Sequence, residues 1–165
     1  VIRLIRQQQI PCVRGNHDEF PSSNNLSTDS RSFLASLPEE IIEGDTIFTH
    51  ISPRLDKWAI VDGGQAWNVF DETDYRLIFV GHAHLCFLFS EKSDEGAWAR
   101  LHPISYNKPI PLDQTERYII SPGPIGYPRD GVNLLRYGIL DDQEYSVQIR
   151  ALKGPMIDLG VGELF

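Results

Sequence analysis

The chain has 165 residues, with 15 Lys and Arg residues against 23 Asp and Glu residues, and a formal net charge of −8. This acidic balance argues against a nucleic-acid backbone or an anionic membrane as the main partner, because both carry negative charge themselves. The length and the hydrophobic fraction of 41% suit one globular unit with its own core, so we expect a single domain over residues 1–165.

No secretory signal or membrane anchor is evident in the sequence. Every apolar run is shorter than the roughly 18 residues that a membrane-spanning helix needs, and we therefore expect a cytoplasmic protein. Cys12 and Cys86 both stand among apolar, strand-like residues. We expect two buried free thiols; a disulfide between them is the alternative, which two cysteines alone do not decide.

The first half of the chain predicts helices mixed with short strands. Residues 1–9 have the pattern of the last turns of an amphipathic helix, and residues 10–13 that of a short buried strand. Asp29 is expected to cap a helix over residues 30–37, before Pro38. Three further elements are expected: a hairpin of residues 41–43 and 46–49 with a turn at Gly44-Asp45, a helix over 65–70, and a fully buried strand over 76–80.

The second half of the chain predicts short strands in a β-meander. They are expected at residues 85–89, 97–101, 117–120, 135–140 and 145–152, with turns between them, one of these turns at 107–111. Strands and helices followed by a run of strands predict an α/β sandwich rather than a purely doubly wound sheet.

Four of the five histidines fall in three short segments: residues 15–18 (GNHD), 49–50 (TH) and 81–84 (GHAH). Each segment directly follows a run of β-forming residues. Imidazole nitrogens and amide oxygens are good ligands for borderline divalent metal ions, so strand ends that bring them to one rim predict a metal site. An extended conformation of 81–84 would point both rings the same way, whereas a sharp turn after Gly81 would aim them at two adjacent ions.

These segments resemble the motifs of the calcineurin-like metallophosphoesterases. GNHD resembles their G-N-H-(D/E) motif, GHAH their G-H-x-H motif, and Thr49-His50 with Ser52-Pro53 the histidine-bearing strand end between them. Residues 121–131 and 137–141 resemble the N-P-G-S-V-G-x-P-R-x-G…Y-x-x-L-D segment of small bacterial phosphodiesterases, the YfcE-like group often labelled diadenosine-tetraphosphatase-related. Ser121 and Pro124 stand where that segment has Asn and Ser.

The resemblance implies an α/β/β/α sandwich that hydrolyses phosphomonoesters or phosphodiesters with two divalent ions, drawn from Mn, Fe, Zn, Co and Ni. The substrate class stays open between a phosphoester small molecule, a nucleotide and a phosphoprotein, and the sequence does not predict an oligomeric state. The site residues that the resemblance implies are Asn16, His50 and His82 on one ion, His84 on the other, His17 as the catalytic acid, and Asp18 behind the ligands, holding their loop.

Arg129 is a candidate for binding the substrate phosphate, with a structural ion pair as the alternative. His102 lies outside every motif and is expected at the surface or at a strand end. Trp58, Trp67 and Trp98 are expected to pack in the protein rather than to stack on a base.

The family's first two motifs, D-x-H and G-D-x-x-(D/N), precede G-N-H-D, and the chain does not contain them in that position. We therefore expect the first βαβ unit to be missing. We also expect these 165 residues alone to bind at most one ion weakly and to hydrolyse phosphoesters negligibly. A phosphoesterase-like binding module without catalysis is the alternative interpretation.

Overall fold

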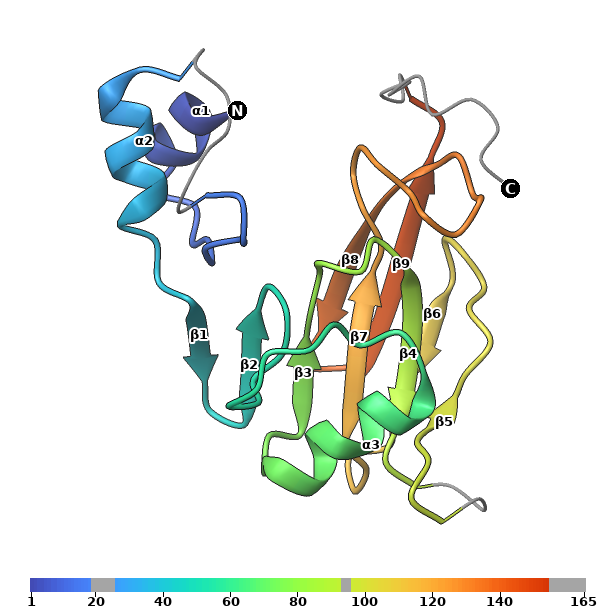
Figure 1. The fold of residues 1–165 in the computed structure, drawn as a ribbon. Helices are drawn as coiled ribbons and strands as arrows, with labels where there is room; N and C mark the ends of the chain where they lie inside the picture. The colour runs from blue at the N-terminus through green and yellow to red at the C-terminus, as the bar shows by residue number, and fades with distance from the viewer. Residues whose placement is uncertain (19–25, 93–95, 155–165) are drawn as a thin grey trace.

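The computed structural model describes residues 1–18, 26–92 and 96–154, which form a mixed α/β fold (Figure 1). In this part of the chain, no helix is both long and apolar enough to cross a membrane. The elements in chain order are α1 Ile2–Gln7, α2 Thr28–Ala35, β1 Glu40–Glu43, β2 Thr46–Thr49, α3 Gly63–Glu72, β3 Leu77–Phe79, β4 Cys86–Ser90, β5 Arg100–Leu101, β6 Pro109–Pro111, β7 Tyr118–Pro122, β8 Leu135–Asp141 and β9 Ser146–Leu152.

Two sheets form the centre of the molecule. The larger sheet has the strand order β1-β2-β3-β7-β4-β5, in which β2, β3 and β7 are parallel and the other pairs antiparallel. The smaller sheet has the order β6-β9-β8 and is antiparallel throughout. The parallel strands matter for function, because the carboxyl ends of β2 and β3 come to the same edge of the sheet.

Successive residues of β7 divide the core into two layers, since side chains of a strand point alternately to opposite faces. Ile119 packs with Val69 of α3 on one face, and Ile120 packs with Val147 and Ile149 of the smaller sheet on the other. All five side chains are fully buried. The layers are therefore α3, the larger sheet and the smaller sheet.

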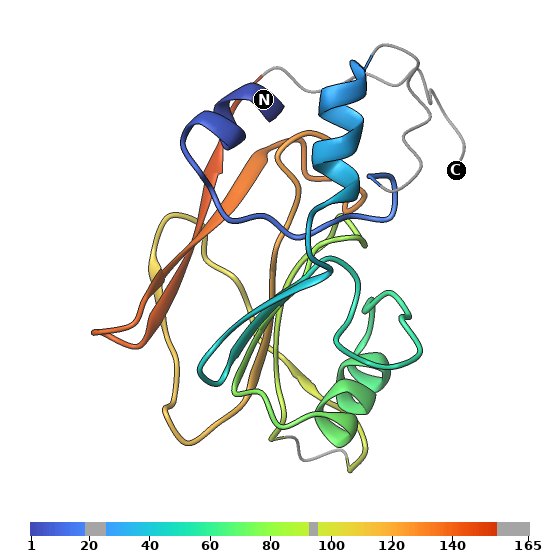
Figure 2. The same cartoon turned by 90° about the vertical axis from the view of Figure 1, so that its left-hand side faces the viewer.

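The expected α/β/β/α sandwich is observed in part. Tyr137 and Ile139 of β8 remain 39% and 45% exposed on the smaller sheet, so no described helix covers them. Helices α1 and α2 instead stand together beyond the β1 edge of the larger sheet, as the two views show (Figures 1 and 2).

Most predicted elements are present in the structure with shifted ends: the helix of residues 1–9, the hairpin and the later strands. The prediction of a buried strand at residues 10–13 was wrong. Among the described residues no strand pairs with this segment, and Ile10 is 47% exposed. Directly after this segment, the backbone N–H of Arg14 donates a hydrogen bond to the Pro38 carbonyl at 2.7 Å. Apolar character alone did not make a strand, because a strand needs a hydrogen-bonding neighbour.

Both predicted helix starts shift towards better caps. Ser27, not Asp29, caps α2, because its hydroxyl accepts the Ser30 N–H at 3.2 Å. Asp62 caps α3 by accepting the Gln65 N–H at 2.9 Å, so that this helix begins at Gly63 rather than at 65.

Two predictions in the meander were also wrong. The turn predicted at 107–111 contains β6, an edge strand in which Ile110 lies between two prolines that the sequence pattern had marked as breakers. Residues 97–99 do not join β5, which contains only Arg100 and Leu101, and the Ala99 N–H donates to the Gly63 carbonyl at 2.9 Å instead of to a strand. Cys12 and Cys86 are free, as expected, but they are only half-buried.

Candidate functional site

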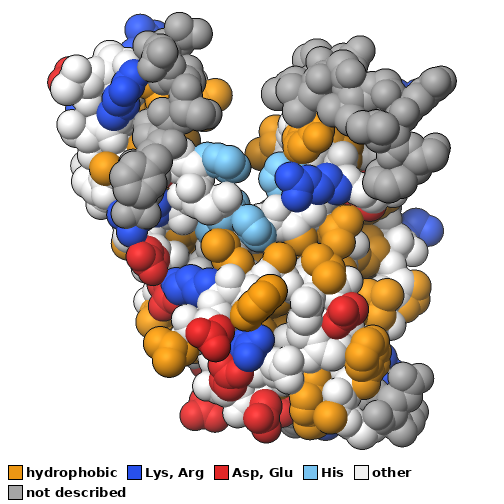
Figure 3. Space-filling view, viewed as in Figure 1, with side chains coloured by type: hydrophobic (Ala, Val, Ile, Leu, Met, Phe, Trp, Pro, Cys, Tyr) orange, Lys and Arg blue, Asp and Glu red, His pale blue; other side chains and the backbone are white. Residues whose placement is uncertain are grey.

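Three loops at the ends of neighbouring segments bring one amide and two imidazoles together. The Asn16 Oδ1 atom lies 2.9 Å from His50 Nε2 and 3.3 Å from His82 Nδ1, and the two ring nitrogens lie 3.3 Å apart. We call Asn16, His50 and His82 the NHH cluster. Histidine side chains gather in a hollow between the part of the molecule that contains α1 and α2 and the part that contains the sheets (Figure 3).

The larger sheet explains why His50 and His82 meet. His50 directly follows β2, and residues 80–82 follow β3, its parallel neighbour. The Gly81 N–H donates to the His50 carbonyl over 2.9 Å and so joins the two loops just beyond the sheet. A Cβ atom on Gly15 would lie 3.4 Å from His50 Cε1, so the absence of a side chain there lets the third loop come close.

The NHH cluster fits a divalent cation in its donor atoms and their spacing. Nitrogen and oxygen ligands at about 2.0–2.2 Å from one ion lie roughly 2.9–3.5 Å from each other, which is the spacing of the three atoms here. Because its third donor is an amide, the cluster is not a His/Cys/Asp/Glu site; in the described ranges no three residues of those four types are grouped to hold a metal ion.

Both imidazoles of the cluster favour the neutral form. Burial is the largest cause of the lowered pKa of His50, followed by the positive charge of His82. Burial also lowers the pKa of His82, and the charge of Arg129 lowers it further. Metal ligation requires neutral imidazole, so these surroundings keep the two rings in the form that binds metal.

Residues 81–84 form a tight turn, so the sharp-turn alternative is the one observed. His82 and His84 have φ values of +43° and +58°, in the left-handed region that is strained for residues other than glycine. The Ala83 N–H donates to the Gly81 carbonyl within the turn. The two rings therefore diverge: the His82 ring belongs to the NHH cluster, whereas the His84 ring points to the Tyr127 carbonyl.

His84 is oriented by a backbone carbonyl. Its Nδ1 lies 2.7 Å from the Tyr127 carbonyl oxygen, and the two rings meet edge to face with centroids 5.5 Å apart. Because that oxygen only accepts, Nδ1 is the donor, and the lone pair of the neutral ring is then on Nε2. A histidine that donates one N–H to a carbonyl and keeps the other nitrogen free has the arrangement found at metal sites. Tyr127 orients His84 through its backbone carbonyl, a role that a sequence motif cannot predict because every residue has this group.

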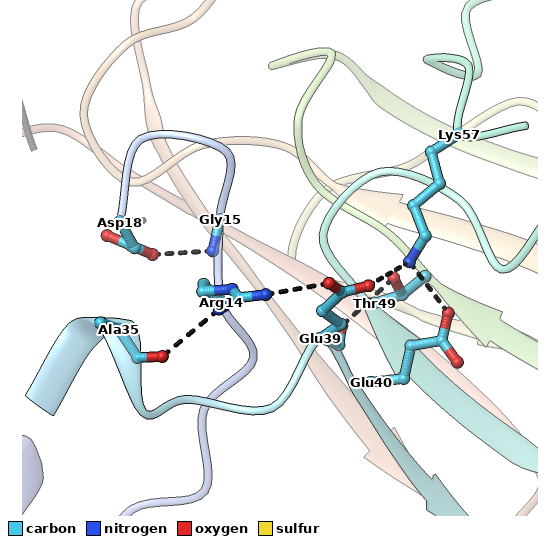
Figure 4. A network of polar contacts seen from close by, with 8 residues as sticks. All are labelled: Arg14, Gly15, Asp18, Ala35, Glu39, Glu40, Thr49 and Lys57. Carbon is cyan, nitrogen blue, oxygen red and sulfur yellow. Dashed lines mark hydrogen bonds and ion pairs between the residues drawn. The ribbon is translucent and has the colours of Figure 1, made fainter. Parts of the chain in front are cut away.

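Asp18 and His17 complete the GNHD loop in different ways. The Asp18 carboxylate accepts the Gly15 N–H at 2.7 Å (Figure 4). The Asp18 backbone N–H donates to the Gly15 carbonyl, so the loop is closed by two bonds. His17 is exposed, and in the chain it directly follows Asn16 of the NHH cluster.

Arg129 lies at the His84 side of the site. Its backbone N–H donates to the His84 carbonyl at 3.2 Å, and its guanidinium lies 5.7 Å from the Tyr127 ring centroid. The neighbouring carboxylate, Asp130, pairs with Arg136 instead. Ser121 is buried and donates its hydroxyl hydrogen to the Leu85 carbonyl at 2.6 Å.

The sequence patterns did not predict a group of charged residues that lines one pocket together with Asn16 and His50. Glu39 accepts hydrogen bonds from Arg14 at 2.9 Å and from Lys57 at 3.0 Å, and Lys57 also reaches Glu40 at 3.3 Å (Figure 4). The one signal in the sequence was that Arg14 directly precedes the GNHD segment.

No protein-family model matches the chain. A search of curated proteins finds "Uncharacterized protein MJ0912" of Methanocaldococcus jannaschii, 34% identical, with the match covering 90% of this chain and 67% of that protein. The chain belongs to the same family as MJ0912. Among solved structures, a metallophosphoesterase from Sphaerobacter thermophilus is 28% identical and superposes with a TM-score of 0.79, covering 93% of this chain and 71% of that one.

This chain therefore has a metallophosphoesterase-like fold. A hypothetical protein, PH1004, from Pyrococcus horikoshii OT3 shares the fold more distantly, with a TM-score of 0.51, 11% identity, and coverage of 77% of this chain and 45% of that one.

Proposed function

We propose that this chain carries the histidine-bearing part of a metal-dependent phosphoesterase of the calcineurin-like, YfcE-like type. The observation that carries the proposal is the convergence of Asn16 Oδ1, His50 Nε2 and His82 Nδ1 within 3.3 Å of one another. The similarity to a solved metallophosphoesterase supports it. The reaction is hydrolysis of a phosphomonoester or a phosphodiester.

In this proposal the NHH cluster holds one divalent ion, and His84 contributes Nε2 to a second. Such ions, when bound, neutralise phosphate charge and lower the pKa of a coordinated water. His17 is exposed beside the cluster and donates a proton to the leaving oxygen. Arg129, held by Tyr127 and His84, binds a phosphate oxygen.

The test is hydrolysis of p-nitrophenyl phosphate and bis(p-nitrophenyl) phosphate with Mn, Fe, Zn, Co or Ni, by these 165 residues and by the full product of the gene. We expect metal-dependent turnover by the full product that His17→Asn reduces by about 100-fold or more. We expect negligible turnover by the 165 residues alone. Robust turnover by these 165 residues would contradict the second expectation, and none by the full product would contradict the first.

A second candidate is a phosphoester-binding module without catalysis. It is favoured by the donor set of the NHH cluster, since none of its three members is a carboxylate. The coding sequence before Val1 separates the two candidates. D-x-H and G-D-x-x-(D/N) motifs there support the enzyme, whereas unrelated residues or a stop codon favour the binding module.

A further inference from the structure

A pocket with several charged and polar side chains in its wall opens beside the NHH cluster, and Arg129 is not part of its described lining. Its volume is about 220 Å³, and two members of the cluster, Asn16 and His50, form part of its wall. The remaining wall includes Arg14, Glu39 and Lys57. A molecule bound at the cluster is therefore in direct reach of two cationic side chains that the proposed hydrolysis does not use.

Both cations converge on one carboxylate. Arg14 comes from the segment that leads into the GNHD loop, and Lys57 from the loop after β2, yet each binds a different oxygen of Glu39, at 2.9 and 3.0 Å. The hydrogen bond and charge of Lys57, and then those of Arg14, lower the pKa of Glu39, so the carboxylate stays ionised. Two cationic side chains that each bind one oxygen of the same carboxylate are already arranged to bind an anion.

The carboxylate is the replaceable member of this group. The Arg14 and Lys57 side chains are 22% and 33% exposed, whereas that of Glu39 is 58% exposed. Arg14 is further held by the Ala35 carbonyl at 3.3 Å and Lys57 by Glu40 at 3.3 Å. Because an exposed ion pair contributes little free energy, Glu39 is able to rotate into water and leave both cations in place.

We propose that Arg14 and Lys57 form a subsite for a second anionic group of the ligand, a phosphate or a carboxylate, and that Glu39 occupies this subsite when the ligand is absent. The assignment to the substrate rests on the proposed phosphoesterase function, but the binding of an anion does not. The substrate then carries an anionic group besides the phosphate that is hydrolysed. Lys57 and Arg14 position this substrate and take no part in the bond cleavage.

Anion binding without metal tests the subsite. Inorganic phosphate and, separately, malonate are titrated into the chain by calorimetry in EDTA, at a pH above the ordinary pKa of histidine. Glu39→Gln removes the competing charge and is expected to tighten binding about two- to fivefold. Lys57→Met is expected to weaken it by a similar factor or abolish it. Glu43→Gln and Lys108→Met, exposed residues of the same types elsewhere, are the matched controls and leave binding unchanged.

The result that overturns the subsite is equal anion affinity in the wild type, Glu39→Gln and Lys57→Met proteins, with unfolding temperatures that show all three to be folded. Tightening for phosphate alone assigns the subsite to a phosphate group, and tightening for malonate alone assigns it to a carboxylate. Failure of the phosphoesterase assay leaves this readout intact, because no turnover is measured, so the two proposals fail separately.

Discussion

The Asn16 amide oxygen lies 2.9 Å from His50 Nε2, although 34 positions separate the two residues in the chain. An amide oxygen and the unprotonated nitrogens of two neutral imidazoles all offer lone pairs, and at these distances the three atoms suit one shared cation. We therefore expect the cluster to bind a divalent metal ion before any substrate is present.

Replacing Asn16, His50 or His82 by Ala should weaken binding of Mn²⁺ or Zn²⁺ by at least about tenfold, because each change removes one of three convergent donor atoms. Isothermal titration calorimetry measures the effect. His102→Gln is the matched control, since His102 contacts Ser90 Oγ at 2.8 Å outside the site. Equal metal affinity in all variants would refute the metal-binding role of the cluster.

Asp18→Ala should weaken metal binding by about tenfold without removing a donor atom, because the GNHD loop then loses the bond from Gly15 N–H that closes it. Asp18→Asn, which keeps an acceptor oxygen, should lie between Ala and wild type. Calorimetry on both variants decides the question. If Asp18→Ala bound metal as tightly as wild type, the closure of the loop would be irrelevant to the site.

Asp130→Asn should destabilise the fold by about 3–5 kcal/mol, because it leaves the guanidinium of Arg136 buried without its counter-charge. Arg136 is fully buried and bonds both Asp130 oxygens, at 2.5 and 3.0 Å, and the Tyr106 hydroxyl at 3.1 Å. Urea unfolding gives the difference in free energy. Asp142→Asn, at an exposed turn, serves as the control and is expected to change stability by less than about 0.5 kcal/mol.

The same ion pair predicts a pH dependence. Burial by itself raises the pKa of Asp130, but the hydrogen bonds from Arg136 and the Val132 N–H outweigh it, so the pKa lies below the usual value. The stabilisation is therefore present above the unfolded pKa, about 3.9, and is lost as the pH falls through the lower folded value. The free-energy difference between wild type and Asp130→Asn should shrink below about pH 4. A constant difference across that range would show that the pair is not linked to protonation.

Gly63→Ala should destabilise the protein by about 1–3 kcal/mol through overpacking. A Cβ atom at Gly63 would lie 2.3 Å from Trp98 Nε1 and 2.6 Å from the Ala99 carbonyl oxygen. Gly138→Ala is the control, because the nearest atom there lies at an ordinary 3.5 Å. Thermal unfolding of the two variants measures the difference, and equal unfolding temperatures would show that Trp98 moves aside at little cost.

Sequence patterns predicted the elements well where local signals were strong. The hairpin of β1 and β2 follows from two apolar runs around Gly44, which has a φ of +62° that glycine adopts without strain. Strand β3 follows from its continuous apolar run. Where an outcome depended on a neighbour, the patterns did not decide it: residues 10–13 look like a buried strand but have no described partner, and Ile110 lies in β6 because β9 pairs with it.

The sequence by itself determined the kinds of donor atoms and their places at the ends of strands, because residue type and β-propensity are local properties. Tertiary structure alone decided which of these atoms meet. The parallel pairing of β2 with β3 brings His50 to His82, while the left-handed turn at residues 82–84 directs His84 away to the Tyr127 carbonyl. Tertiary structure also placed Arg14, Glu39 and Lys57 around one pocket. Contacts between distant segments depend on the order of strands in the sheet and on the path of the loops rather than on local sequence.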